Sequence, residues 1–325
     1  MRVRRDSDPD PARTELAQAP IRVALVGVGK IAREQHAPAL AADATFELAA
    51  AVSRHAALGG VRTFTNLESL LDAKLAIDAV SLCTPPAGRH ALARAALDAG
   101  LHVMLEKPPG ATVSEVNDLA ARAHAAGLTL FATWHSREAI GVEPARAWLA
   151  QRTVMAVRTT WKEDIRVWHP GQNWILEPGG FGVFDPGINA LSILTRILPQ
   201  RLTLRGATLH FPANRFAPIS AELDLLHGDA APAPAVFDFL EAGPQRWDIE
   251  VATDRGVLLL SEGGQRVHID GVEQFAAANR EYPRLYSRFA QLIANGISDV
   301  DVTPLQLVAD AFMLARRVET AAFEF

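Results

Sequence analysis

Short apolar runs and longer stretches with helical spacing alternate over the first part of the chain. Continuous apolar runs are typical of central parallel strands that are covered on both faces. They predict strands at 21–26, 46–53, 77–83, 102–106 and 128–133. The stretches between them predict helices at 30–41, 67–73, 88–99 and 114–126. Strand and helix in alternation favour an α/β fold, a doubly wound parallel sheet with helices on both faces.

The pattern changes after about residue 150. Short runs separated by turn residues predict a mainly antiparallel sheet, with strands at 154–161, 202–211, 222–226, 235–240, 248–253, 257–261 and 266–270. Helices are predicted at 185–198, 284–294 and 304–322. We therefore expect a flexible tail at 1–20, one domain at 21–150 and a second, α+β domain at 151–325. The C-terminal helix is a candidate for packing back against the first domain.

Composition restricts the class of protein. The 325 residues are 49% apolar and 21% charged, so the chain can bury a core, and its net charge of −5 disfavours nucleic acid as a main partner. The single cysteine, Cys83, excludes an internal disulfide and a paired-cysteine metal site, and it fits a reducing compartment. No apolar run reaches the ~18 residues of a membrane span, and no signal-peptide core is present. We expect a soluble cytoplasmic protein without a metal, because no spacing of His, Asp and Glu suggests one.

The sequence GVGKIA at 27–32 follows the first strand and opens a helix. This is the setting of the glycine-rich fingerprint of Rossmann dinucleotide-binding folds. Gly27 permits a tight turn, and Gly29 lets the backbone approach a pyrophosphate. Free N–H groups at the helix start, around Lys30 and Ile31, face the anion. The motif predicts that the first domain binds NAD or NADP, and a purely structural turn is the alternative.

The residue that closes the second strand is expected to contact the adenosine ribose, where NAD-selective folds place an acid. Here Ser53 takes that place and Arg54 follows it. A hydroxyl and a guanidinium suit a 2′-phosphate, which an acid would repel. We therefore expect NADP to be accepted at least as well as NAD. A solvated turn is the alternative.

Two strands of the predicted parallel sheet end in a pair of prolines, CTPP at 83–86 and EKPP at 106–109. Both motifs lie at the carboxyl edge of the sheet, where ligands of doubly wound folds bind. The prolines restrict the backbone, so the Lys107 ammonium is expected to be held toward the site. An ordinary surface lysine is the alternative. We expect five further residues of this region to contact the cofactor: Thr84, Pro85, Pro86, His90 and Glu106. For His90, a packing or helix-surface role is the alternative.

The segment GGFGVFDPGIN at 179–189 leads into a predicted helix. Asp185 begins this helix, and Asn189 lies four residues later on the same helix face. Asp185 is also a suitable N-cap, so a purely capping role is the alternative to a functional one.

GVGKIA, CTPP, EKPP and DPGIN occur in an order and at spacings that resemble the glucose-fructose oxidoreductase, inositol dehydrogenase and MocA superfamily. The resemblance covers residues 21–325, and within the superfamily the chain looks like the sugar 1-dehydrogenases that act on D-galactose or L-arabinose. That branch has asparagine, as in Asn189, where many relatives carry histidine. The resemblance implies an open-faced sheet in the second domain and a catalytic site between the domains, formed by Lys107, Asp185 and Asn189. It also implies a sugar pocket lined by Asp185, Asn189, His135, Glu163, Trp168, His169 and Trp247.

The reaction so implied is oxidation of a pyranose of the galactose, arabinose or fucose type at C1, giving the aldonolactone and NAD(P)H. Asp185 is the candidate base for the O1 proton, and Lys107 would stabilise charge on O1. The sequence leaves open whether these two roles are exchanged.

Three rival functions stay open. They are an oxidoreductase of the same superfamily with another sugar or polyol, a non-catalytic dinucleotide-binding regulatory protein, and a glycosidase that uses a bound nicotinamide. A homo-oligomer formed through the open sheet face is a further expectation.

Overall fold

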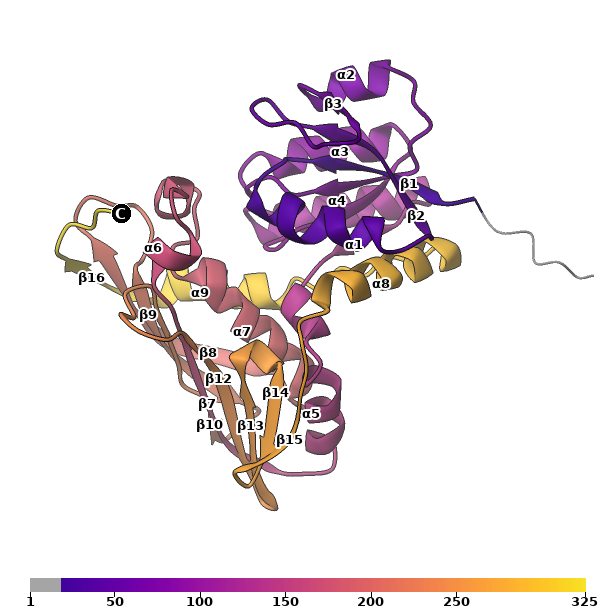
Figure 1. The fold of residues 1–325 in the computed structure, drawn as a ribbon. Helices are drawn as coiled ribbons and strands as arrows, with labels where there is room; N and C mark the ends of the chain where they lie inside the picture. Colours follow the sequence, from indigo (N-terminus) through magenta and orange to yellow (C-terminus); the bar gives the residue numbers. More distant parts are fainter. Residues whose placement is uncertain (1–18) are drawn as a thin grey trace, which may run out of the picture.

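A computed structural model describes residues 19–325, so nearly all of the tail predicted at 1–20 lies outside the described residues. Figure 1 shows two lobes. The N-terminal lobe contains a six-stranded sheet, and the C-terminal lobe contains a ten-stranded sheet. Within residues 19–325, no helix combines the length and apolarity that crossing a bilayer requires.

The six-stranded sheet has the order β3-β2-β1-β4-β5-β6, and all of its pairs are parallel. This is the Rossmann order, which confirms the predicted fold of the first half of the chain. The short edge strand β3 is absent from the prediction because three residues carry too little periodicity. The strands are β1 (Ile21–Val26), β2 (Phe46–Val52), β3 (Arg62–Phe64), β4 (Ala79–Leu82), β5 (His102–Leu105) and β6 (Leu130–Ala132).

Helices cover both faces of this sheet. One face carries α2 (Leu67–Asp72), α3 (Arg89–Asp98) and α4 (Val113–Ala126). The other face carries α1 (Ala37–Ala41), which follows a π-helical turn at Ala32–His36, and α8 (Glu281–Asn295). The N-terminal lobe therefore takes a whole helix from the C-terminal part of the sequence.

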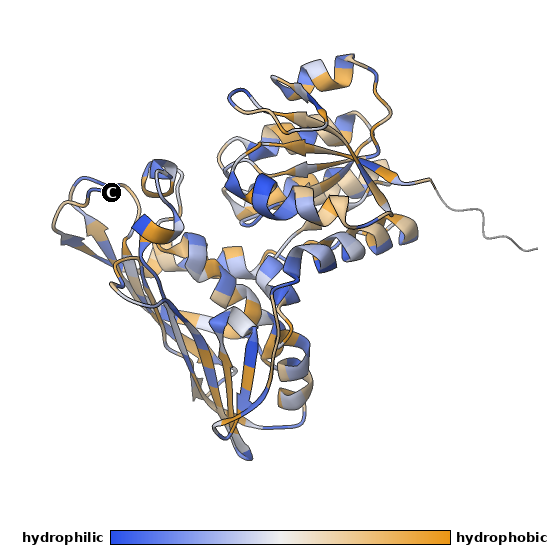
Figure 2. Cartoon of the chain, in the orientation of Figure 1, coloured by the Kyte–Doolittle hydropathy of each residue, from blue (hydrophilic) through white to orange (hydrophobic). Residues whose placement is uncertain are grey.

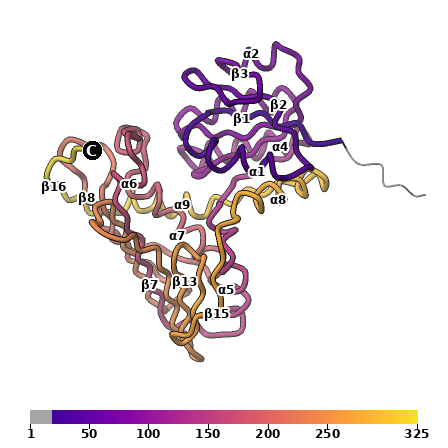
Figure 3. The backbone as a smooth tube through the Cα atoms, viewed as in Figure 1, coloured from indigo at the N-terminus to yellow at the C-terminus, as the bar shows by residue number. Residues whose placement is uncertain are grey.

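Helix α8 buries Leu285, Phe289 and Leu292 against the N-terminal sheet. Each such side chain contributes about 1.5–3 kcal/mol when it is fully buried. The tube in Figure 3 shows the resulting path, in which the chain leaves the N-terminal lobe after β6, returns for α8 and leaves again before α9 (Thr303–Leu314). The helix that returns to the first sheet is α8, whereas α9 packs on the second sheet.

The ten-stranded sheet has the order β15-β14-β13-β12-β7-β11-β9-β8-β16, and β10 pairs with β9. Two of its pairs, β11 with β7 and β16 with β8, are parallel, and the others are antiparallel. The predicted mainly antiparallel sheet is thus confirmed. Its strands are β7 (Val154–Lys162), β8 (Leu202–Pro212), β9 (Ser220–His227), β10 (Ala231–Pro232), β11 (Ala235–Asp238), β12 (Arg246–Thr253), β13 (Gly256–Ser261), β14 (Arg266–Ile269), β15 (Val272–Ala276) and β16 (Arg316–Thr320).

One face of this sheet packs on α5 (Val142–Leu149), α7 (Phe184–Ile197) and α9, which form the largest core of the protein with it. The hydropathy colours in Figure 2 alternate along these strands, as a sheet with one covered face requires. The prediction of one helix over 304–322 is wrong beyond Leu314. Ala315 is extended, with ψ 142°, and the alternating residues after it form the parallel edge strand β16.

Candidate active site

A cleft of about 540 Å³ lies where the carboxyl ends of β1, β4 and β5 face the loop after β7. From the N-terminal lobe it is lined by the glycine-rich turn, the CTPP and EKPP motifs and Arg89. From the C-terminal lobe it is lined by Trp168, His169, Pro170, Gln172, Trp174 and Asp185. Of the residues predicted for cofactor and substrate, the cleft brings together Gly27, Gly29, Lys30, Ile31, Thr84, Pro85, Pro86, Glu106, Lys107, Trp168, His169 and Asp185.

The glycine-rich turn has the shape that a dinucleotide needs. Gly27 has φ +94°, and a Cβ there would lie 2.9 Å from both Cγ2 and the backbone N of Thr84, so no larger residue fits. A Cβ on Gly29 would have no atom within 4 Å, which leaves the backbone open to the cleft. The Thr84 hydroxyl is buried and has no hydrogen-bond partner within residues 19–325. A bound pyrophosphate fits this site, because the turn at Gly27 is tight, the backbone at Gly29 is accessible and the Thr84 hydroxyl is available as a donor.

Three predicted cofactor contacts lie outside the lining of this cleft. Ser53 and Arg54 follow β2 at the same carboxyl edge of the sheet, and Ser53 Oγ accepts from the backbone N–H groups of residues 55 and 56. His90 Nε2 lies 2.8 Å from a carboxylate oxygen of Asp118, so this ring joins α3 to α4. The structure therefore does not bring His90 to the cofactor cleft, because its position in α3 directs it to the neighbouring helix.

Arg89 is a lining residue that the sequence analysis missed. Its side chain is buried, and its guanidinium donates to the carbonyl oxygens of Thr84, Glu106 and Pro108. Burial lowers the pKa of Arg89 to about 10. The guanidinium thus ties the CTPP loop to the EKPP loop. A sequence signal was present, since this arginine starts the helix just after CTPP, but surface arginines are common in such positions.

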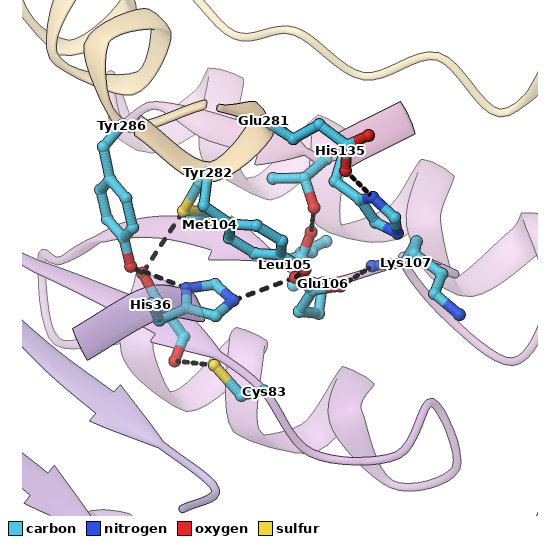
Figure 4. Close-up of polar contacts among 12 residues, drawn as sticks. His36, Cys83, Met104, Leu105, Glu106, Lys107, His135, Glu281, Tyr282 and Tyr286 are labelled. Atoms are coloured by element: carbon cyan, nitrogen blue, oxygen red, sulfur yellow. Dashed lines mark hydrogen bonds and ion pairs between the residues drawn. The ribbon is translucent and has the colours of Figure 1, made fainter. Parts of the chain in front are cut away.

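Both carboxylate oxygens of Glu106 make polar contacts within the protein. Its carboxylate Oε1 accepts from the Tyr282 hydroxyl at 2.6 Å and lies 2.9 Å from His36 Nε2, while Oε2 accepts from the backbone N–H of Lys107 at 2.8 Å (Figure 4). Burial alone raises the pKa of Glu106, but the hydrogen bond and charge of His36 hold it well below its ordinary value. Glu106 therefore anchors the peptide bond that carries Lys107.

His36 completes this buried network. Its Nδ1 lies 2.8 Å from the hydroxyl of Tyr286, which in turn lies 3.0 Å from the Ser81 hydroxyl. Burial lowers the pKa of His36, but the groups around the ring, Cys83 first and Glu106 among them, raise it well above its usual value. The network joins the π-helical turn, β4, the residue after β5 and α8 (Figure 4).

His135, predicted for the sugar pocket, lies beside this network. Its Nδ1 is 2.6 Å from Glu281 Oε2, and its ring stacks on Tyr282 with 5.7 Å between centroids. Gln265 also donates to Glu281, so the start of α8 is held by the segment after β6 and by the C-terminal lobe. His135 is not among the residues that line the cleft.

Lys107 and Asp185 meet in the cleft. Lys107 Nζ lies 3.2 Å from Asp185 Oδ2 and donates to the Asp185 carbonyl oxygen at 2.8 Å. The two side chains are 15% and 6% exposed, so their interaction is only weakly screened by water. Asp185 stands in the first turn of α7. Asn189 follows one turn later and lies outside the cleft lining.

Aromatic and acidic side chains extend the site into the C-terminal lobe. Glu163 is 2% exposed; its carboxylate accepts from Trp247 Nε1 at 2.9 Å and lies 2.9 Å from His169 Nε2. The ring centroids of Trp168 and Trp247 lie 4.8 Å apart. Trp168 and His169 line the cleft and form its aromatic wall, whereas Glu163 and Trp247 contact them from outside the lining.

Comparison with known proteins agrees with this geometry. Residues 21–133 match the model of an oxidoreductase family, GFO_IDH_MocA, with an NAD-binding Rossmann fold. A galactose 1-dehydrogenase from Pseudomonas fluorescens is 44% identical over 316 residues, which is 94% of this chain and 99% of that protein. The chain belongs to the GFO/IDH/MocA oxidoreductase family. The resemblance stated from the motifs is thereby confirmed.

Two solved structures extend the comparison. The crystal structure of a D-galactose-1-dehydrogenase from Rhizobium etli matches with a TM-score of 0.91 and 53% identity, over 95% of this chain and 99% of that one. A 3-ketoreductase from Actinomadura kijaniata, solved with NADP, matches with a TM-score of 0.80 and 21% identity, over 93% and 99% of the two chains. At that identity the second match shows the fold alone.

Proposed function

We propose that this oxidoreductase is an NAD(P)-dependent aldose 1-dehydrogenase, which oxidises a pyranose of the galactose, arabinose or fucose type to the aldonolactone. The observation that carries the proposal is the Lys107–Asp185 pair, placed in the cleft between the nucleotide-binding turn and the aromatic wall. The two galactose dehydrogenases that match nearly the whole chain support the choice of substrate.

Residues 21–150 and 151–325 are proposed as the cofactor and sugar domains. The backbone around Gly29, the Thr84 hydroxyl, and Ser53 with Arg54 would hold the cofactor, and Arg54 favours use of NADP. When bound, the nicotinamide accepts the hydride that leaves C1 of the sugar.

Hydride leaves C1 more readily as the O1 proton is removed, so a base is needed within hydrogen-bond reach of O1. Asp185 supplies that base in our proposal, because it lines the cleft from the first turn of α7. The Lys107 ammonium, 3.2 Å from that oxygen, stabilises negative charge that develops on O1. Asn189 contributes an amide that orients a sugar hydroxyl.

The aromatic wall suits the rest of a pyranose. The apolar C–H face of the ring can pack on Trp168 or Trp247, and His169 can contact a hydroxyl group, while Glu163 holds the His169 and Trp247 rings. We further propose a cytoplasmic protein that forms a homo-oligomer through the open face of the ten-stranded sheet.

The experiment is a panel of galactose, arabinose, fucose, xylose, glucose and inositol, each with NAD and with NADP, followed by absorbance of the reduced nicotinamide. We expect turnover with galactose-type aldoses and lactone as the product. Turnover of inositol alone would make the protein a polyol dehydrogenase. Absence of turnover in a protein that binds cofactor would favour the regulatory alternative.

A further inference from the structure

His169 is held on one side by a buried carboxylate and faces the Lys107–Asp185 pair with the other. His169 Nε2 lies 2.9 Å from Glu163 Oε1, and His169 Nδ1 lies 3.8 Å from Asp185 Oδ2. We propose that the proton released from O1 of the sugar passes through Asp185 to Nδ1 of His169, with Glu163 as the positioning residue that sets the ring. This inference rests on the proposed function and names the path of its proton.

Glu163 is fixed on every side. Its backbone N–H donates to the Asp238 carbonyl at 2.9 Å, and its Oε2 accepts from the indole N–H of Trp247 at 2.9 Å. An ionised carboxylate only accepts hydrogen bonds, so the Nε2 atom of His169 carries the hydrogen in the 2.9 Å contact. In a neutral imidazole the other nitrogen, Nδ1, is then an unprotonated acceptor.

The His169 ring is also fixed by packing. The backbone N–H of His169 donates to the Ile165 carbonyl at 2.8 Å, which ends helix α6 (Ile165–Trp168). The ring lies edge-on to Phe239, a fully buried side chain, with 5.5 Å between centroids. Turning the ring would break both the Glu163 contact and the Phe239 contact. The acceptor nitrogen Nδ1 therefore stays directed toward Asp185.

A sugar hydroxyl fits between the two acceptors. The 3.8 Å between His169 Nδ1 and Asp185 Oδ2 is too long for a direct hydrogen bond. The oxygen of a second sugar hydroxyl can lie about 2.8 Å from both atoms, which is an ordinary hydrogen-bond distance. It accepts from the Asp185 carboxyl once that group has taken the O1 proton, and its own hydrogen donates to Nδ1. A substrate hydroxyl at this point would complete the path from Asp185 to the imidazole.

The charges around the ring favour proton uptake. Glu163 and Asp185 contribute two negative charges, and Lys107 contributes one positive charge, so a proton on His169 brings the four groups to neutrality. The neighbouring side chain on α7, Asn189, is an amide and does not serve as a base. His169 is thus the group beside Asp185 that can take the proton onward, and its 17% exposed side chain gives a way out to solvent.

The step balances without a further reactant. The O1–H bond breaks and its proton moves to the Asp185 carboxylate and then to Nδ1. The electron pair of the C1–H bond leaves as hydride to the nicotinamide oxidant of the proposed function, and the C1=O1 bond forms. The imidazolium, held by Glu163, then gives its proton to water.

The test uses His169→Gln and Glu163→Gln, with His124→Gln as the matched control, because His124 is exposed on α4. For both test variants we expect kcat with galactose to fall by about 10²-fold. We expect KM to change much less, and imidazole added to His169→Ala to restore part of the rate. A residue that only binds sugar would mainly raise KM, and imidazole would not rescue it.

A second readout needs no turnover. In ¹⁵N-histidine NMR of the protein without substrate, we expect the neutral His169 ring to carry its hydrogen on Nε2, and Glu163→Gln to weaken this preference. A hydrogen on Nδ1, or wild-type kcat in His169→Gln, overturns the inference while the sugar oxidation stands. A wild-type protein that oxidises no aldose overturns the proposed function and, with it, the role of His169 in a proton path.

Discussion

The buried pair of His36 and Glu106 gives the sharpest stability prediction. His36→Gln removes the imidazole whose Nε2 lies 2.9 Å from Glu106 Oε1, and the two side chains are only 1% and 5% exposed. The variant leaves a buried carboxylate without its cation. Since Glu106 also accepts from the backbone N–H of Lys107, we expect the change to loosen the strand end that carries Lys107 as well as to destabilise the fold.

The size of the effect follows from burial. Removing one partner of a buried ion pair costs about 3–5 kcal/mol, and almost no solvent is present here to reduce it. Tyr282 O–H and Lys107 N–H still donate to the carboxylate, so we expect the lower end, about 3 kcal/mol. With a urea dependence of about 3 kcal/mol per molar, the unfolding midpoint falls by about 1 M.

The pH dependence of the unfolding free energy distinguishes the His36–Glu106 ion pair from other contacts. Glu106 has a lowered pKa, so its contribution is complete above pH 4.5 and is lost as pH falls through the folded-state pKa. His36 has a raised pKa, so its contribution is complete below pH 6.5 and is lost as pH rises through the folded-state pKa. The difference in unfolding free energy between wild type and His36→Gln should therefore be largest between pH 4.5 and 6.5.

The assay is urea unfolding followed by far-ultraviolet circular dichroism. Tryptophan fluorescence is unsuitable alone, because all six tryptophans lie at or after residue 134, beyond the first sheet. His124→Gln is the control and should match wild type. A difference below about 1 kcal/mol in the pH 4.5–6.5 window, or one that grows above pH 6.5, would refute the buried ion pair.

Three further predictions concern the proposed catalytic and cofactor residues. Lys107→Met and Asp185→Asn should each lower kcat by about 10²–10⁴ in steady-state assays, and near wild-type rates would remove them from the chemistry. Arg89→Met leaves buried carbonyls without a donor, at about 1–3 kcal/mol each, so the urea midpoint should fall and the KM for cofactor should rise; an unchanged midpoint contradicts the proposed tie between the loops. Arg54→Ala should lower kcat/KM for NADP several-fold, about 1 kcal/mol for an exposed pair, and leave NAD unchanged; equal losses would exclude a 2′-phosphate contact.

Periodicity along the chain predicted most of the fold. The strand Ile21–Val26 is apolar at every position except Arg22, and the helix Phe184–Ile197 buries most of its residues, so their local patterns match their surroundings. Edge strands lack a run of apolar residues that would predict them. Among residues 19–325, the edge strand Arg316–Thr320 pairs with β8 alone, and its residues are of mixed polarity. It forms a strand because it hydrogen-bonds to the edge of β8.

The motifs predicted which loops form the cleft but not how each side chain is used. Glu106 was predicted to contact the cofactor and His135 the sugar, yet Tyr282 and Glu281 of α8 engage them. Those partners lie about 150 residues or more away in the chain, and only the return of α8 to the first sheet brings them close. A single sequence holds no local record of such a contact. The same is true of Arg89, whose carbonyl partners are set by the turn geometry of two loops.

The central claim is that the cleft removes hydride from C1 of an aldose. The direct measurement is turnover of D-galactose deuterated at C1, with the reduced cofactor and the sugar product analysed by mass spectrometry. We predict a slower reaction than with ordinary galactose, deuterium in the reduced nicotinamide, and a lactone without deuterium. Reduced cofactor without deuterium, with the label retained at C1, would show oxidation at another carbon and contradict the account.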